Sequence, residues 1–376
     1  MRDTRTPVLS DNGRTELDTL LDAKVDQRDV PGVVVEVANR ERTLYRGAFG
    51  KLDHQGAVDM PKEAIFPIAS MTKPVTSVAV MILKDQRFFD LDDVVGQYLP
   101  EFKGAEVIVE FDESNSSYTT RPAAREITLR HLLNHTAGFG YAFSNYTLSK
   151  LGDRLPAIPP LLHDPGTRWT YGMSTRVLGR VIEKVTNQSL DVFFESSIFE
   201  PLGMRDTGFH LRPEDRPRLA PRFRRINGER TGEPNPASYE PNVFGDGGLL
   251  STASDYRSFL RMLLGMGEFH GDRILTERSV QDMTKNQIGD LVVELQPGAI
   301  PDRSNLAAVF TAAIVPENKV DRPVFGPRLT PEATMSGGSP KPPSIESMTI
   351  KAGGAPTEND WIPSRSRISN SSTANV

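Results

Sequence analysis

A serine and a lysine, three residues apart, are the first residues of this chain whose types and spacing could do chemistry. Ser70 and Lys73 lie where a short extended run ends and an apolar segment of helical character begins. If Ser70 lies in the first turn of that helix, Lys73 projects from the same face one turn later. A serine hydroxyl needs a neighbouring base to become a nucleophile, and a partly desolvated lysine can provide one. The spacing therefore raises the hypothesis of nucleophilic catalysis. A chance Ser-x-x-Lys match with Ser70 as an ordinary helix N-cap is the alternative, which these four residues alone favour and which the rest of the chain must overturn.

A tyrosine is the second candidate. Tyr171 follows a Pro-Gly turn and directly precedes a helical pattern, so its hydroxyl could carry a proton at a helix start. The alternative is a core tyrosine that covers the end of the helix. The nearby Gly172-x-Ser174-x-Arg176 nearly matches a Gly-x-Ser-x-Gly nucleophile elbow, but Arg176 replaces the second glycine and no clear strand precedes it. We therefore discount Ser174 as a nucleophile.

Two histidines four residues apart have the spacing of a zinc-binding helix. No glutamate stands between His131 and His135 to act as a base, and no third ligand is evident. We predict that no metal and no cofactor is bound, and that His135 bonds free carbonyls at the end of its helix.

Composition excludes several classes of function. The 376-residue chain has no cysteine, which excludes disulfides and thiolate chemistry, and its net charge of -5 argues against a nucleic-acid partner. The first residues lack the apolar core of a signal peptide, and no run of about eighteen apolar residues could span a membrane. We expect a cytoplasmic protein with no membrane partner.

The order of the predicted elements gives the fold class. An amphipathic helix is expected over residues 14–27, with Leu17, Leu20, Leu21 and Val25 on one stripe, followed by two hairpin strands at 33–38 and 43–49. A helix followed by antiparallel strands predicts an α+β architecture.

Later segments divide into helices and connections. Residues 127–141 are expected to form a helix that ends in a glycine-containing loop, whereas 111–126 and 211–244 are expected to be irregular. The pattern weakens from about residue 286, although 347–354 could form a strand that closes a site.

Taken together, these stretches resemble the serine β-lactamase-like superfamily, and within it the family VIII carboxylesterases related to class C β-lactamases. The resemblance covers roughly residues 14–285. The motifs that carry it are Phe66-x-Ile68-Ala69-Ser70-Met71-Thr72-Lys73, Leu132-Leu133-Asn134-His135-Thr136-Ala137-Gly138, Trp169-x-Tyr171, Glu200-Pro201-Leu202-Gly203-Met204-Arg205-Asp206-Thr207 and Gly247-Gly248-Leu249-x-Ser251-Thr252.

The resemblance implies a β-lactamase/transpeptidase-like fold, in which a mixed, mainly antiparallel sheet with flanking helices adjoins a mostly helical lobe. We expect residues 1–69 and 245–376 to form the sheet lobe and 70–244 the helical lobe, with the active site between them. It further implies that Ser70 is the acylated nucleophile, Lys73 its base partner and Tyr171 the proton shuttle.

Two departures from the family pattern bear on the substrate. β-Lactamases have Tyr-x-Asn where this chain has Tyr171-Gly172-Met173, and a methionine cannot make the hydrogen bonds of that amide. The third motif, Lys-Thr-Gly in lactamases and often Trp-x-Gly in the esterases, is best matched by Lys351-Ala352-Gly353. Gly354 follows, and its N–H would join that of Ser70 in an oxyanion hole. We assign Met173, Tyr141 and Gly247 to the substrate pocket.

The resulting hypothesis is a serine carboxylesterase that hydrolyses short-chain or small aromatic esters through an acyl-enzyme on Ser70. A β-lactamase or D-Ala-D-Ala peptidase is the enzymatic alternative, and a related acyltransferase or amide hydrolase would use the same scaffold. The alternative of another class is a catalytically weak binding homologue, in which the divergent C-terminal region has lost the oxyanion hole.

Overall fold

A computed structural model describes residues 9–27, 30–53, 55–226, 229–233, 242–293 and 348–352 of the chain. One end of the molecule is a three-stranded antiparallel sheet in the order β11-β1-β2, formed by β1 (Gly32–Ala38), β2 (Thr43–Gly50) and β11 (Met348–Ala352). Val35 of β1 is opposite Gly47 on one side and Lys351 on the other. The predicted hairpin is therefore confirmed, and 348–352 forms the predicted strand.

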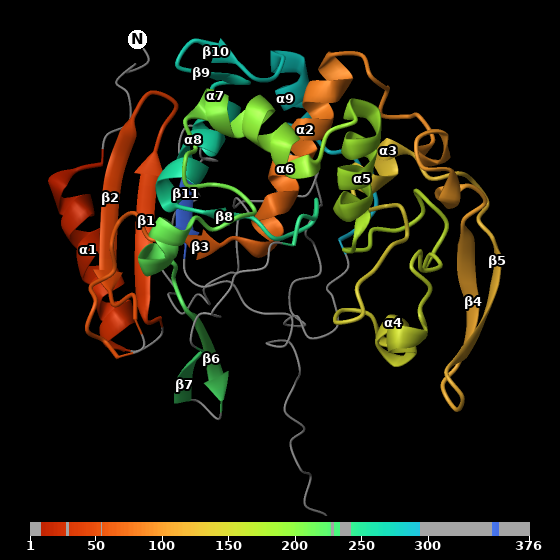
Figure 1. Ribbon diagram of the computed structural model, residues 1–376, viewed down its shortest axis with the longest axis horizontal. Helices are drawn as coiled ribbons and strands as arrows, with labels where there is room; N and C mark the ends of the chain where they lie inside the picture. The colour runs from red at the N-terminus through yellow and green to blue at the C-terminus, as the bar shows by residue number, and fades with distance from the viewer. Residues whose placement is uncertain are drawn as a thin grey trace, which may run out of the picture.

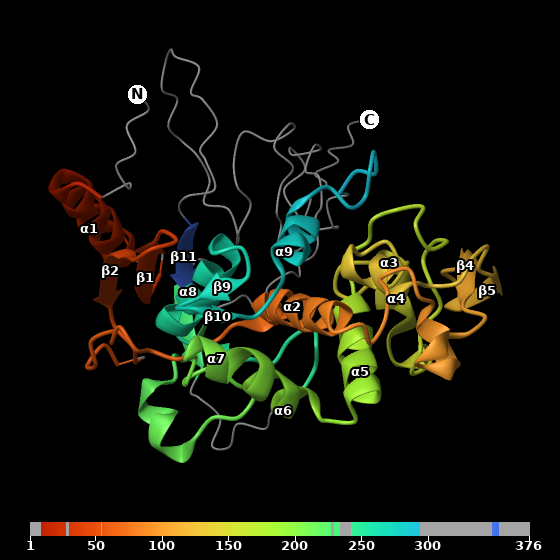
Figure 2. The ribbon, with the colours of Figure 1, turned by 90° about the horizontal axis from the view of Figure 1, so that it is seen from above.

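Helices cover both faces of this sheet (Figure 2). Helix α1 (Asp11–Asp26) begins after Ser10, whose side chain accepts a hydrogen bond from the Gly13 N–H, and it packs on the face that carries Val33 and Val35. Helix α8 (Ala253–Leu264) packs on the opposite face, where Val34 contacts the same core cluster as Ala253. The alternation of a strand thus explains why successive valines serve two different helices.

The predicted stripe of helix α1 is wrong at one position. Leu21 is buried and Leu17 and Val25 are half-buried, but Leu20 is 50% exposed. The i, i+4, i+8 row of a helix lies along one line, and here that line alone meets the sheet. Leu20 lies at the edge of the stripe and therefore faces solvent.

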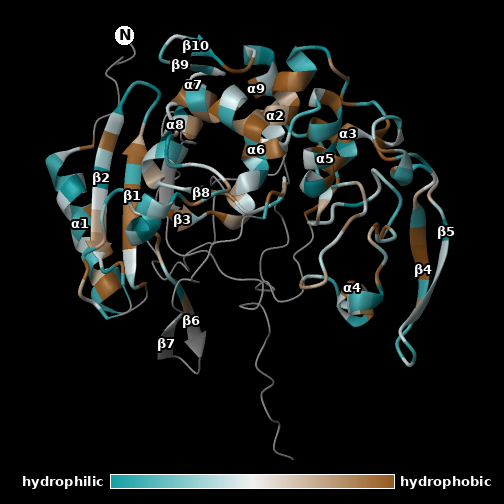
Figure 3. Ribbon diagram, viewed as in Figure 1, coloured by the Kyte–Doolittle hydropathy of each residue, from teal (hydrophilic) through white to brown (hydrophobic). Residues whose placement is uncertain are grey.

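The centre of the molecule is helix α2 (Thr72–Asp85), whose residues Thr72 to Leu83 are all buried. Figure 3 shows hydrophobic colour along α2 and β1, in contrast to the largely hydrophilic α1. The chain enters α2 through the short strand β3 (Phe66–Pro67) and a 3₁₀ turn, Ala69–Met71. Strand β3 pairs with β8 (Leu250–Ser251), which leads directly into α8.

Further helices pack around α2 and at the far end of the molecule (Figure 1). Helix α5 contacts both α2 and α3, and their buried side chains belong to one core cluster. The bounds of these elements are α3 (Leu129–Leu133), α4 (Tyr146–Leu151), α5 (Ser174–Thr186), α6 (Leu190–Phe194), α7 (Glu200–Leu202) and α9 (Glu277–Thr284), with a small hairpin of β9 (Glu268–Phe269) and β10 (Asp272–Arg273).

Three predicted segments differ in the structure. The stretch expected as an exposed loop at 111–126 is largely part of a hairpin of β4 (Glu106–Asp112) and β5 (Ser117–Pro122). The long connection at 211–244 contains a second hairpin, β6 (Arg222–Ile226) with β7 (Glu229–Glu233). The helix expected at 127–141 is only the short α3, because the backbone turns at His135 with φ 58°. Strands β5, β6 and β7 consist mainly of polar residues, so hydrophobic alternation is weak in their sequences, although Val107, Val109 and Phe111 do alternate in β4.

The sheet end and the end that holds α3, α4, β4 and β5 lie on opposite sides of α2 in both ribbon views (Figures 1 and 2). The division into a sheet lobe of 1–69 with 245–376 and a helical lobe of 70–244 stays a prediction. No helix within the described ranges is long and apolar enough to cross a membrane.

Candidate active site

Ser70 is exposed at the start of α2, on a turn whose backbone is strained. Its neighbour Ala69 has φ 44°, a left-handed conformation that is unfavourable for alanine. The turn is held on both sides, because the Ile68 N–H donates to the Leu249 carbonyl at 2.9 Å and the Tyr256 hydroxyl donates to the Met71 carbonyl at 3.0 Å. These hydrogen bonds hold the backbone on both sides of Ser70, whose side chain is exposed.

Lys73 lies beneath the serine and is almost fully buried, with 1% of its surface exposed. Its Nζ donates to Ser70 Oγ at 3.0 Å and to the backbone carbonyl of Asp246 at 2.8 Å. No carboxylate of the described residues forms an ion pair with it. A buried ammonium without a carboxylate partner is costly. Lys73 instead contacts a hydroxyl and a carbonyl, and its distance to Ser70 meets the requirement for a general base.

Tyr171 is a neighbour of the lysine, with its ring centroid 4.9 Å from Lys73 Nζ. The preceding Thr170 N–H donates to the His135 carbonyl at 2.9 Å, and the His135 and Tyr171 rings are 5.0 Å apart. Gly172 is needed here, because an added Cβ would lie 2.1 Å from the Phe139 carbonyl oxygen. The structure thus brings together Ser70, Lys73 and Tyr171, whose catalytic roles stay predictions.

A second tyrosine, Tyr141, also faces the lysine, with its ring centroid 5.4 Å from Lys73 Nζ. Its hydroxyl donates to Asp246 Oδ2 at 2.6 Å, and Arg176 Nε lies 3.0 Å from the other carboxylate oxygen. Burial and the negative charge of Asp246 raise the pKa of Tyr141 well above its ordinary value. Tyr141 therefore stays protonated at neutral pH.

Asp246 and Arg176 had no functional role in the sequence interpretation. The available signal for Asp246 was its place in the glycine-rich stretch 244–248, where close backbone approach is expected. Close approach occurs at Gly245, whose added Cβ would lie 2.3 Å from the Thr175 carbonyl oxygen. At the predicted pocket residue Gly247 an added Cβ would meet no atom within 4 Å, so that position faces open space.

The remaining predicted site residues are less well connected to the lysine. Met173 precedes α5 and is half-buried against the hydrophobic core, two residues from Tyr171. Lys351 lies in β11 with its backbone paired to Val35 of β1. Gly353 and Gly354 lie outside the described residues, and the oxyanion role of this third motif stays a prediction.

The contacts of the two histidines favour structural roles. His131 Nδ1 accepts a hydrogen bond from the Thr128 N–H and so caps its own helix. His135 is buried, its ring packs against Trp169 and Tyr171, and burial together with the nearby Lys73 lowers its pKa to about 3. No group of three or more potential metal ligands occurs in the part of the chain that the structure describes.

Comparison with known proteins gives the family. The family model described as Beta-lactamase matches residues 17–292, most of the chain. The chain belongs to the beta-lactamase family. The predicted resemblance is thereby confirmed, as is the β-lactamase/transpeptidase-like α+β fold. As a member of this beta-lactamase family the protein is a serine hydrolase by class, in a fold that hosts both hydrolases and acyltransferases.

The similar proteins include one without a named activity, an esterase and a synthase. Protein Rv1367c of Mycobacterium tuberculosis is 33% identical over 313 residues, which cover 79% of this chain and 78% of that protein. Esterase EstB of Burkholderia gladioli is 33% identical over 216 residues, or 51% of this chain and 50% of that protein. Among solved structures, a mutant of simvastatin synthase from Aspergillus terreus superimposes with a TM-score of 0.65 at 26% identity, covering 76% of this chain and 70% of that one.

Proposed function

We propose that this protein is a serine carboxylesterase, similar to the family VIII enzymes, that hydrolyses short-chain or small aromatic esters through an acyl-enzyme on Ser70. The observation that carries the proposal is the 3.0 Å hydrogen bond from the buried Lys73 Nζ to the exposed Ser70 Oγ. An exposed hydroxyl can reach a substrate carbonyl, and the amine beneath it is placed to take the proton.

The proposed reaction has two steps. In the first, Ser70 Oγ attacks the ester carbonyl carbon while its proton passes to the Lys73 amine, and the tetrahedral intermediate expels the alcohol, which receives a proton through Tyr171. In the second, water attacks the acyl-enzyme, gives a proton to the same pair, and releases the acid with Ser70 restored. Lys73 Nζ lies 4.9 Å from the centroid of the Tyr171 ring, so the two residues are neighbours, and the role of Tyr171 as proton carrier is the one that the family resemblance implies.

Ester substrates are favoured over β-lactams by one residue. Met173 stands where β-lactamases have the asparagine of Tyr-x-Asn, and a thioether is at most a weak acceptor with no donor. The relationship to Esterase EstB supports the same choice. We further propose a small-molecule substrate, with neither nucleic acid nor membrane as a partner, and action in the cytoplasm.

Acyl transfer is the second candidate. An acyl-enzyme can be released by any hydroxyl that reaches it, and a similar structure belongs to a protein named a synthase. Adding a series of alcohols to the ester assay separates the two functions. An esterase releases mostly free acid, whereas an acyltransferase forms the new ester at millimolar acceptor concentration.

The direct test is turnover of p-nitrophenyl acetate and p-nitrophenyl butyrate by the wild-type protein and by Ser70→Ala. We expect hydrolysis by the wild type and its loss in the variant. Equal turnover by Ser70→Ala would refute the proposal. Nitrocefin, assayed in parallel, reports the β-lactamase alternative, for which we expect much slower turnover than of the esters. Ligand binding without any turnover would favour the binding homologue.

A further inference from the structure

Asp246 accepts a hydrogen bond from the candidate catalytic Lys73 through its backbone carbonyl. Its side chain is only 3% exposed, and both carboxylate oxygens have a donor, the Tyr141 hydroxyl on Oδ2 at 2.6 Å and Arg176 Nε on Oδ1 at 3.0 Å. Its carbonyl accepts from Lys73 Nζ at 2.8 Å. Asp246 therefore contacts Lys73 through its backbone carbonyl and Tyr141 through its carboxylate.

The turn that carries Asp246 is fixed from several directions. Thr76 of α2 donates to the Gly245 carbonyl at 2.6 Å, and Gly245 approaches α5 so closely that a Cβ would collide with the Thr175 carbonyl. The Arg176 guanidinium also lies 4.4 Å from the Phe244 ring centroid. These contacts hold Phe244 and Gly245, and the bonds of the Asp246 carboxylate restrain the next peptide unit, whose carbonyl accepts from Lys73.

The same carboxylate makes the two tyrosines beside Lys73 unequal. The hydroxyl of Tyr141 is engaged by Asp246, and the described contacts of Tyr171 are ring contacts with Lys73, His135, Trp169 and Tyr141. A hydroxyl that donates to a carboxylate keeps its proton and cannot also pass one to a leaving group. Tyr171 is therefore the tyrosine available for proton transfer.

We propose that Asp246 is a positioning residue, which through its bond to Tyr141 and its pairing with Arg176 holds its own carbonyl where Lys73 Nζ is directed at Ser70 Oγ. The inference rests on the proposed esterase function. Tyr141 then serves to position Asp246 and does not transfer a proton. Arg176 serves as the ion-pair partner of Asp246.

Asp246→Asn tests the proposal, because it removes the charge and one acceptor while keeping the shape of the side chain. We expect kcat for p-nitrophenyl butyrate and the rate of fluorophosphonate labelling of Ser70 to fall roughly 10- to 100-fold. The KM for this small ester should change less than about threefold, since Asp246 is not proposed to contact the substrate.

Asp255→Asn is the matched control for a merely structural loss. Asp255 is also a buried aspartate, and it accepts from the Asp206 N–H and the Thr207 hydroxyl far from Lys73 along the chain. It should lower the unfolding temperature while labelling of the folded protein remains at the wild-type rate. If Asp246→Asn behaves in the same way, with a lower unfolding temperature but wild-type labelling of the folded protein, the proposal is overturned.

Tyr141→Phe provides a second route, which also serves if Asp246→Asn does not fold. We expect a 3- to 10-fold fall in kcat, and the double variant with Asp246→Asn should be no slower than Asp246→Asn alone, because both act through one unit. Wild-type rates in Tyr141→Phe, or a rise in KM with unchanged kcat in Asp246→Asn, would contradict the positioning role. If the wild type itself neither labels nor turns over, the esterase proposal fails instead.

Discussion

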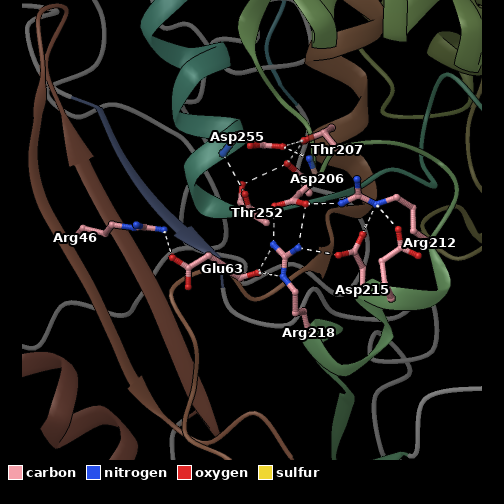
Figure 4. A network of polar contacts seen from close by, with 11 residues as sticks. Arg46, Glu63, Asp206, Thr207, Arg212, Asp215, Arg218, Thr252 and Asp255 are labelled. Carbon is pink, nitrogen blue, oxygen red and sulfur yellow. Dashed lines mark hydrogen bonds and ion pairs between the residues drawn. The ribbon is translucent and has the colours of Figure 1, made fainter.

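Two polar clusters in this molecule join segments that are far apart in the chain, yet they are built in opposite ways. The Lys73 centre consists of Ser70, Lys73, Tyr141, Tyr171 and Asp246. The Arg218 network consists of Asp206, Arg212, Asp215 and Arg218 (Figure 4). The buried amine of the first has no carboxylate partner among the described residues, whereas every charged side chain of the second has an ion-pair partner.

The Arg218 network is saturated with ion pairs. Arg218 lies 2.5 Å from Asp206 and 2.8 Å from Asp215, and it also donates twice to the Glu63 carbonyl, at 3.0 and 2.8 Å. Arg212 pairs with both aspartates. Burial opposes ionisation of Asp215, but hydrogen bonds from Arg212 and Arg218 prevail and lower its pKa. Such a cluster has no group left to react.

The difference in charge pairing indicates which of the two clusters can react. Complete charge pairing stabilises a junction between segments, and incomplete pairing leaves a group whose protonation can change during a reaction. The Lys73 centre meets the second description, because its amine contacts a hydroxyl and a carbonyl. The following variants should therefore affect the two clusters in different ways.

Lys73→Ala should have the largest effect on activity. Removing the base beneath Ser70 is expected to lower kcat/KM for p-nitrophenyl butyrate about 10³-fold, within the usual range for a lost general base. Lys84→Ala, near the other end of α2, is the control, since Lys84 lies near Asp85 and Asp282 and donates to the Ser279 hydroxyl. Comparable losses of kcat/KM in both variants would contradict a special role of Lys73.

The two tyrosines sharpen the comparison within the Lys73 centre. Tyr171→Phe should lower kcat about 10²- to 10³-fold, because the proton carrier is lost, while Tyr141→Phe should lower it no more than about tenfold. Steady-state kinetics on both variants measures the ratio. The reverse order would mean that Tyr141, despite its bond to Asp246, carries the proton.

Arg218→Ala should act on stability instead. Two carboxylates lose their main partner, so we expect the free energy of unfolding to fall by about 3 kcal/mol. Denaturant unfolding measures this loss, and activity per folded molecule should remain near the wild-type value. Substitution of the exposed neighbour Arg205 by alanine should be nearly neutral. Loss of activity in a folded Arg218→Ala protein would show that the network reaches the site.

His135 gives the smallest effect, which depends on pH. Its pKa of about 3 lies below the ordinary value, so the unfolded chain binds the additional proton between about pH 6.5 and 3. Stability should therefore fall as the pH falls through this window, by about 2 kcal/mol between pH 7 and pH 5 from this group alone. His135→Gln should flatten the acid slope of unfolding, with the exposed His210→Gln as control. An unchanged slope would contradict a buried, neutral imidazole.

Local patterns in the sequence were sufficient for much of this account. Ser70 and Lys73 are one helical turn apart, so their proximity follows from helix geometry once the helix is predicted. The β1–β2 hairpin and the α+β class, both confirmed, likewise follow from short-range alternation and connection length.

Contacts between residues far apart in the chain could not be predicted from the sequence. Asp246 meets Lys73 across 173 positions of the chain, and only the folded turn reveals that its carbonyl accepts the lysine. For Arg176 the sequence indicates only that it replaces the second glycine of a nucleophile-elbow pattern. The hairpins β4–β5 and β6–β7 were missed because β5, β6 and β7 consist mainly of polar residues and carry little period-two hydrophobic signal, while the alternation of Val107, Val109 and Phe111 in β4 was not used.

The most direct test of the central claim is intact-mass spectrometry after brief incubation with a fluorophosphonate, followed by peptide mapping, with p-nitrophenyl butyrate turnover measured on the same sample. We predict a single adduct on Ser70, loss of turnover in proportion to labelling, and no adduct on Ser70→Ala. Absence of labelling on the folded wild-type protein, or an adduct that persists in Ser70→Ala, would contradict the claim that Ser70 is the nucleophile.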